Sequence, residues 1–108
     1  LMTTFAVKYE YKYIELSAEG HADSFFVDKD GNDLVCAVVS TILQCAYVGC
    51  EKYSSECAIV RCYDGHFSFK CRSNPNTRAI IDTALIGLRE AARQFPESIR
   101  EKGGEKKW

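Results

Sequence analysis

One of the six cysteines lies where a thiol becomes reactive. Cys36 follows Asp33, which we expect to cap a helix beginning at Leu34, so the thiol lies in the first helical turn. The unpaired amides and the positive end of the helix dipole favour thiolate over thiol there. The same amides could bind the oxyanion of an acyl-transfer intermediate. Cys36 is therefore the candidate nucleophile, and none of the other five cysteines has this setting.

His21 is the candidate base for this nucleophile. It lies where a predicted strand gives way to a polar loop, and Gly20 beside it provides backbone freedom. From this place the imidazole could take the thiol proton, as a cysteine–histidine pair requires. We expect Asp33 mainly to cap the helix, and only secondarily to orient His21. The Ser40 hydroxyl is expected to hydrogen-bond to the backbone of its own helix. The alternative to a catalytic pair is that Cys36 is a structural residue of the core and that His21 is a polar loop residue.

Other chemistries lack the residues that they need. The sequence has no G-x-S-x-G, H-E-x-x-H or phosphate-binding loop motif, and no Cys followed six positions later by Arg. No two cysteines are spaced C-x-x-C, and neither histidine has a second ligand at zinc-finger spacing. We therefore expect no metal and no cofactor. Most of the thiols are expected to be small core residues, and His66 an exposed hairpin residue.

The first half of the chain must position this pair. Alternating apolar residues predict two strands within 3–19, and the polar, acidic stretch 20–32 is predicted to be a loop. A helix follows from 34 to about 49. Because it is apolar nearly all round, we expect it to be buried on most of its circumference.

The second half of the chain repeats the pattern of strands before a helix. Two short strands, 57–63 and 66–71, flank a D-G turn that favours a tight hairpin. After an N-P-N turn at 74–76, apolar residues recur at three- and four-residue steps until Pro96 ends the helix. The segment 100–108 is predicted to be a charged, flexible tail. The expected stripe comprises Ile81, Ala84, Leu85, Leu88, Ala91, Ala92 and Phe95.

These elements predict an α+β fold in the order β-β-α-β-β-α, with an antiparallel or mixed sheet packed with two helices. With 108 residues, 46% of them hydrophobic and 27% charged, the chain has the size of a single domain, 1–108. The net charge of −1 provides no basic field for nucleic acid or a membrane surface. No secretion signal is recognisable, so we expect a reducing, cytoplasmic location.

The sequence resembles the ribosomal-processing cysteine protease (Prp) family. The resemblance rests on G-H-A at 20–22 and on G-N-D-L-V-C-A-V-V-S at 31–40. In the second half, the D-G turn, I-I-D-T-A-L-I-G-L at 80–88 and Q-F-P-E at 94–97 also agree with that family. The similarity therefore extends in order over nearly the whole chain.

This resemblance implies a homodimeric cytosolic endopeptidase that removes the N-terminal extension of a large-subunit ribosomal protein. Its dyad would be Cys36 as nucleophile and His21 as base, with a mobile loop at 22–32. In that loop, we hypothesise that Phe25 and Phe26 pack on an apolar substrate segment. Between positions 15 and 33 the only basic residue is Lys29, whereas six residues are acidic, namely Glu15, Glu19, Asp23, Asp28, Asp30 and Asp33. We expect these six residues to form an acidic rim, which suits a basic ribosomal protein.

Two other functions remain open for these residues. The first is a non-catalytic dimeric module that binds a basic ribosomal protein through the acidic rim, with Cys36 in the core. The second is a redox sensor that pairs Cys36 with another thiol. The apolar first helix supports a dimer in the protease and in the binding module, because one small sheet and one helix would not cover it completely.

Overall fold

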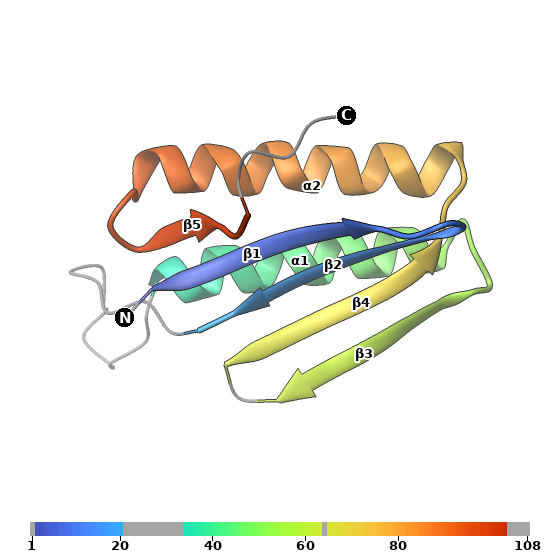
Figure 1. Cartoon of the computed structure of the whole chain (residues 1–108), viewed down its shortest axis with the longest axis horizontal. Helices are drawn as coiled ribbons and strands as arrows, with labels where there is room; N and C mark the ends of the chain where they lie inside the picture. The colour runs from blue at the N-terminus through green and yellow to red at the C-terminus, as the bar shows by residue number, and fades with distance from the viewer. Residues whose placement is uncertain (1, 21–33, 64, 104–108) are drawn as a thin grey trace.

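A five-stranded sheet with both helices on one face forms the molecule, as a computed structural model of residues 2–20, 34–63 and 65–103 describes it (Figure 1). The α+β class and the mixed sheet agree with the prediction. The elements are β1 (Thr3–Tyr9), β2 (Tyr13–Glu19), α1 (Leu34–Glu51), β3 (Cys57–Tyr63), β4 (His66–Arg72), α2 (Pro75–Gln94) and β5 (Ile99–Glu101).

The order of strands across the sheet is β3-β4-β2-β1-β5. All neighbours are antiparallel except β1 and β5, which run parallel. The register places Glu19 opposite Thr4 on one side and opposite His66 on the other, and Tyr63 opposite His66. One end of the sheet therefore gathers the start of β1, the end of β2 and the turn between β3 and β4.

Strand β5 corrects the predicted tail, which began at about residue 100. Ile99–Glu101 pair instead with Thr3–Phe5, and the Ile99 side chain is buried. Glu101 accepts two hydrogen bonds from the Arg89 guanidinium on α2, at 2.8 and 2.9 Å. A strand of three residues has no detectable period, and its partner lies at the other end of the chain. Local pattern therefore missed it.

Helix α2 follows the predicted stripe and packs it against the sheet. Asn74 caps the helix, with Pro75 in the first turn and a reciprocal hydrogen-bond pair between Asn74 and Thr77. The expected turn at 74–76 is thus the beginning of the helix itself. Its buried residues include the five predicted ones up to residue 91, namely Ile81, Ala84, Leu85, Leu88 and Ala91.

Helix α1 is buried on one face only, and the expectation of burial on most of its circumference is wrong. The sheet and α2 cover the face that carries Val35, Val39, Leu43, Ala46 and Cys50. On the outer face, Val38 is 41% and Val48 50% exposed. The reason is the two-layer architecture, which leaves the outer side of both helices without a covering layer.

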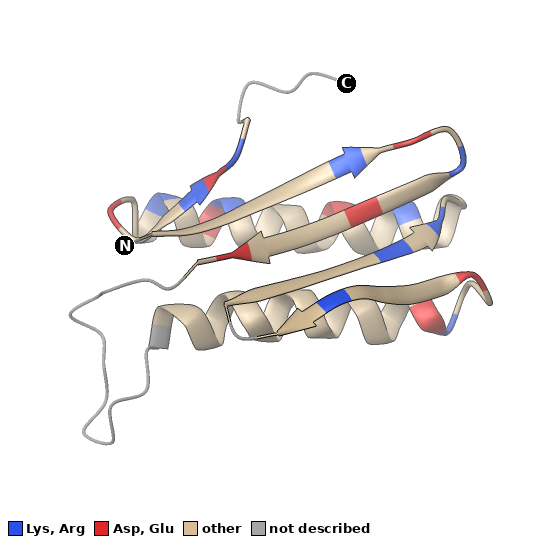
Figure 2. Ribbon diagram, turned by 60° about the horizontal axis from the view of Figure 1, so that its bottom comes forward, with Lys and Arg blue, Asp and Glu red and all other residues tan. Residues whose placement is uncertain are grey.

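The opposite face of the sheet is polar. Figure 2 shows Lys, Arg, Asp and Glu of both signs on the strands that lie in front of the helices. On this face Lys70 pairs with Glu10 at 2.8 Å. No helix within the described residues is long and apolar enough to cross a membrane.

Candidate active site

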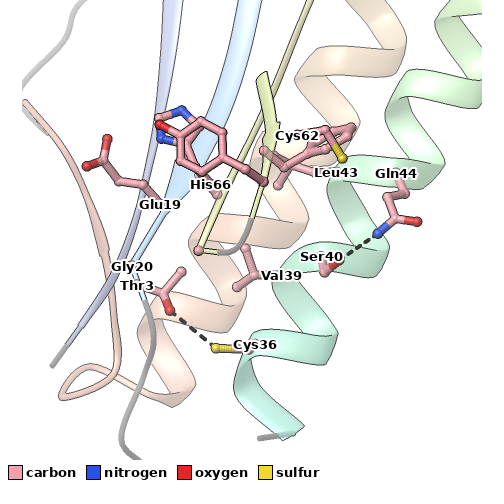
Figure 3. A pocket seen from close by; sticks show the side chains of 14 residues that line it. Thr3, Glu19, Gly20, Cys36, Val39, Ser40, Leu43, Gln44, Cys62 and His66 are labelled. Carbon is pink, nitrogen blue, oxygen red and sulfur yellow. Dashed lines mark hydrogen bonds between the residues drawn. The ribbon is translucent and has the colours of Figure 1, made fainter. Parts of the chain in front are cut away.

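A cavity of about 240 Å³ lies where the first turns of α1 meet the end of the sheet (Figure 3). Its inner wall is apolar and its rim polar. The wall includes Val39, Leu43 and Phe67, and the rim carries Glu19, Tyr63 and His66. Such a concave site, apolar inside with a few polar groups, is typical of a place where a protein binds part of a substrate.

Cys36 lies on this wall, in the first turn of α1. Its side chain is half-buried. The described first turn of the helix carries no acidic residue, and the predicted cap, Asp33, lies outside the described residues. The predicted position of the thiol at the start of a helix is therefore present in the structure.

The Thr3 hydroxyl contacts the candidate nucleophile, with 3.7 Å between Thr3 Oγ1 and Cys36 Sγ. Thr3 is only 3% exposed. Its backbone N–H donates to the Ser98 carbonyl at 2.9 Å, and Ile99 stands opposite it in β5. The hydroxyl is thus held by the sheet rather than by α1. Sequence analysis missed Thr3, because 33 positions separate it from Cys36 and no local spacing relates them.

Gly20 shapes the edge of the same cavity. Its φ is +97°, and its N–H donates to the Gly65 carbonyl at 2.8 Å. A Cβ at this position would lie 2.3 Å from the Met2 carbonyl oxygen. Both the positive φ and the close approach require glycine, in agreement with the backbone freedom expected there.

Several predicted site residues lie outside the described residues. These are His21, Asp33, Phe25 and Phe26. The contact between His21 and Cys36 and the cap formed by Asp33 therefore stay predictions. What the structure does bring together is Gly20, the residue before His21, and Cys36, since both line one cavity.

Ser40, one turn after Cys36, also lines the cavity. We expected its hydroxyl to bond to the backbone of its own helix. The structure instead shows it accepting a hydrogen bond from the Gln44 side-chain amide at 2.6 Å. This pair forms a polar part of the wall (Figure 3).

His66 is not the exposed hairpin residue that we expected. It is half-buried at the rim, with its ring 5.2 Å from that of Tyr63. The antiparallel pairing of β3 with β4 places Tyr63 opposite His66, and the pairing of β2 with β4 places Glu19 opposite His66. In the sequence, the D-G turn indicated the pairing of Tyr63 with His66. The pairing of Glu19 with His66 depends on the register between β2 and β4, which the sequence does not show. Two members of the predicted acidic rim, Glu15 and Glu19, are among the described residues, and Glu19 lines the cavity.

The other five cysteines differ from Cys36 in setting. Cys45 and Cys62 are exposed, Cys50 and Cys71 are buried, and Cys57 is half-buried. Cys62 lines the cavity as well, but from the end of a strand, where no helix dipole acts on it. Within the described part of the chain, no group of three or more His, Cys, Asp or Glu residues could hold a metal ion.

A family model for the cysteine protease Prp matches residues 2–100 of the chain. Searching curated proteins gave no match. Among solved structures, a crystal structure of an essential ribosomal processing protease Prp from S. aureus, with a covalently linked product peptide, is 28% identical to this chain. The TM-score is 0.74, with 93% of this chain and 97% of that chain covered.

Two further structures share the fold. A second structure of the S. aureus protease, in complex with a substrate peptide, is 26% identical, with a TM-score of 0.65 and the same coverage of both chains. The protein SMU.848 from Streptococcus mutans is 24% identical, with a TM-score of 0.63 and coverage of 93% of this chain and 91% of that chain. At that identity the last similarity supports the fold alone.

Proposed function

This chain belongs to the Prp family of cysteine proteases, and from that premise we propose that it removes the N-terminal extension of a large-subunit ribosomal protein. In this proposal Cys36 is the nucleophile and His21 is its base. Neither a metal nor a cofactor takes part in the reaction.

The observation that carries the proposal is the setting of Cys36. Its thiol lies in the first turn of α1, on the wall of a cavity and beside the Thr3 hydroxyl. The positive end of a helix dipole stabilises a thiolate, and the cavity provides room for the substrate next to it. A structural cysteine of the core needs none of these three features.

In the first half of the reaction, His21 takes the proton of the Cys36 thiol, and the sulfur attacks the carbonyl carbon of the scissile peptide bond. The carbonyl oxygen becomes an oxyanion, which backbone amides in the first turn of α1 are suited to bind. When the C–N bond breaks, His21 gives its proton to the leaving amine. The extension then remains on Cys36 as a thioester.

In the second half, His21 takes a proton from a water molecule, and the resulting hydroxide attacks the thioester carbonyl. The C–S bond breaks and the extension leaves as a carboxylic acid. The imidazolium returns its proton to the Cys36 thiolate, which restores the free enzyme.

We assign Thr3 as a positioning residue for Cys36. As a donor, its hydroxyl would stabilise the thiolate and hold the sulfur toward the cavity. Because Thr3 is buried and fixed by the contacts of β1 with β5, the hydroxyl does not need to be ordered during the reaction.

The walls of the cavity favour an apolar side chain next to the scissile bond. Leu43 and Phe67 provide apolar surface, and Glu19 adds a negative charge at the rim, which suits a basic protein substrate. Both S. aureus structures hold peptides, one described as a product and one as a substrate. We propose that Phe25 and Phe26 add further apolar contact with the substrate.

The test is mass spectrometry of a ribosomal protein that carries its N-terminal extension, after incubation with this protein. Loss of one defined N-terminal peptide is expected with the unmodified chain and not with Cys36→Ala. If the ribosomal protein stays intact while Cys36 reacts rapidly with iodoacetamide, the protease acts on a different substrate. An intact ribosomal protein together with an unreactive Cys36 would instead support the binding module.

We also propose a homodimer and a cytoplasmic location. Exposed apolar side chains support association, because Ile59 and Val60 on β3 are 44% and 47% exposed and the outer face of α1 carries Val38 and Val48. Light scattering measures the mass directly, and a monomer at micromolar concentration would contradict the dimer. The location follows from the proposed substrate and is tested by cell fractionation.

A further inference from the structure

We propose that Cys57 and Cys71 form a peroxide-sensitive thiol pair, which a peroxide converts reversibly into a disulfide between β3 and β4. This site is separate from the proposed active site. Cys50, which contacts Cys71, follows Cys36 by 14 positions on α1. With the rise per residue of an α-helix, Cys50 lies about 21 Å from Cys36 along the axis of α1.

The strand register places the two thiols face to face. Cys57 and Cys71 are direct partners across the antiparallel pair β3–β4. The next pair along, Glu56 and Arg72, is a hydrogen-bonded one, because the Arg72 N–H donates to the Glu56 carbonyl at 2.9 Å. Paired residues alternate between hydrogen-bonded and non-hydrogen-bonded positions, so Cys57 and Cys71 occupy a non-hydrogen-bonded position. Their Cα atoms are then about 4.5 Å apart, within the range that a disulfide spans.

The Glu56 side chain holds this register in place. Its carboxylate accepts a hydrogen bond from the Tyr13 hydroxyl at 2.8 Å and pairs with the Arg72 guanidinium at 3.3 Å. These contacts join the start of β3 to both β2 and β4. A slip of one residue would break them and turn Cys57 away from Cys71.

The surroundings of the pair prepare it for oxidation. Cys71 is fully buried, whereas Cys57 is half-buried and brings one sulfur of the pair to the surface. Hydrogen bonds, the strongest from the Cys50 thiol, lower the pKa of the Cys71 thiol despite its burial. Burial raises the pKa of Cys57 to about 12. Of the two thiols, Cys71 is therefore the one that more readily becomes a thiolate, and Cys57 keeps its proton until the disulfide forms.

The chemistry balances with hydrogen peroxide as the oxidant. The Cys71 thiolate attacks one peroxide oxygen, the O–O bond breaks, and hydroxide leaves a sulfenic acid on Cys71. The hydroxide takes up the proton that Cys71 had released. The Cys57 sulfur then attacks the Cys71 sulfur, the S–O bond breaks, and the OH group leaves as water with the Cys57 proton. In sum, two thiols and one hydrogen peroxide give one disulfide and two waters.

The experiment maps the bridge in the native protein. Reduced protein is treated with hydrogen peroxide, quenched, blocked with N-ethylmaleimide and digested with trypsin without reduction. Trypsin cuts after Arg61 and Lys70, so Cys57 and Cys71 fall in different peptides that only a disulfide keeps together. A linked peptide pair containing Cys57 and Cys71, abolished by dithiothreitol, is the expected result. No link, or a bridge that uses Cys50, would overturn the proposal.

Thermal unfolding provides a second measurement. A disulfide that closes a loop of about 15 residues should raise the Tm by at least about 5 °C after peroxide treatment. Cys57→Ser should remove this rise. Cys62→Ser, an exposed cysteine on the same strand, should keep it. An equal rise in both variants would contradict the proposal. Neither measurement depends on the peptide-cleaving activity proposed for this protein, so the result stands apart from the proposed function.

Discussion

At its N-terminal end, helix α1 places the half-buried Cys36 on the wall of a cavity, whereas at its C-terminal end it places Cys50 in the core against Cys71. Both residues are thiols on the same face of one helix. At the first end, the sulfur lies in the first helical turn and contacts a threonine hydroxyl. At the second, the sulfur meets other thiols, and its pKa is raised by its hydrogen bond to Cys71 and by burial.

This difference shows that position along the helix, more than residue type, decides what a thiol can do. A thiolate is stabilised at the start of a helix and opposed at its end, because the dipole changes sign between the two. Burial in an apolar core opposes the charged form further. The proposed nucleophile therefore reacts with a peptide, the proposed redox pair reacts with a peroxide, and each needs its own test.

Replacing the nucleophile should give the largest effect. Cys36→Ala is expected to lower kcat/KM for peptide cleavage by at least about 1,000-fold, because no other group forms the thioester. The fold should persist, as circular dichroism can check. Cys45→Ala, an exposed cysteine on the same helix, is the matched control and should cleave normally. An active Cys36→Ala protein would end the proposed mechanism.

Replacing the proposed base should lower activity somewhat less than replacing the nucleophile. His21→Ala is expected to lower kcat by about 100- to 10,000-fold and to slow the alkylation of Cys36 by iodoacetamide, since general base catalysis contributes that much. The second histidine provides the control: His66→Ala removes a side chain at the rim and should change kcat by less than about tenfold. If His66→Ala were the more damaging change, the base would lie at the rim.

The hydroxyl that contacts the nucleophile should have a moderate effect. Thr3→Val keeps the shape and removes the hydrogen bond, so we expect kcat to fall by about ten- to hundredfold, as for hydrogen bonds to charged groups. Alkylation of Cys36 by iodoacetamide should also become slower. Thr3→Ser should restore both properties. A Thr3→Val protein with an unchanged rate of Cys36 alkylation would make Thr3 a structural residue only.

At the other end of the helix, substitution should leave catalysis unchanged and affect stability alone. Cys50→Ala removes a fully buried sulfur and should lower the free energy of unfolding by about 1–2 kcal/mol, measured by urea denaturation. Cys45→Ala on the exposed face should change it by less than about 0.5 kcal/mol. Loss of cleavage in a stably folded Cys50→Ala protein would show that the two ends of α1 are coupled.

Features that depend on neighbours in sequence were predictable. The stripe of α2, the hairpin around the D-G turn and the place of Cys36 in a first helical turn all follow from spacings of a few residues. For the candidate site, this was enough to propose the nucleophile and its base. The same local patterns overestimated the burial of α1, because an apolar sequence does not say how many layers will cover it.

Sequence alone therefore predicted every described element except β5, since hydrophobic period, caps and turns act over one or two helical turns. Tertiary structure alone decided that Thr3 contacts Cys36, that His66 lies at the rim beside Glu19, and that Cys57 faces Cys71. Each of these contacts joins distant segments through strand register. Register is fixed by packing the whole sheet against the helices, which a local pattern does not contain.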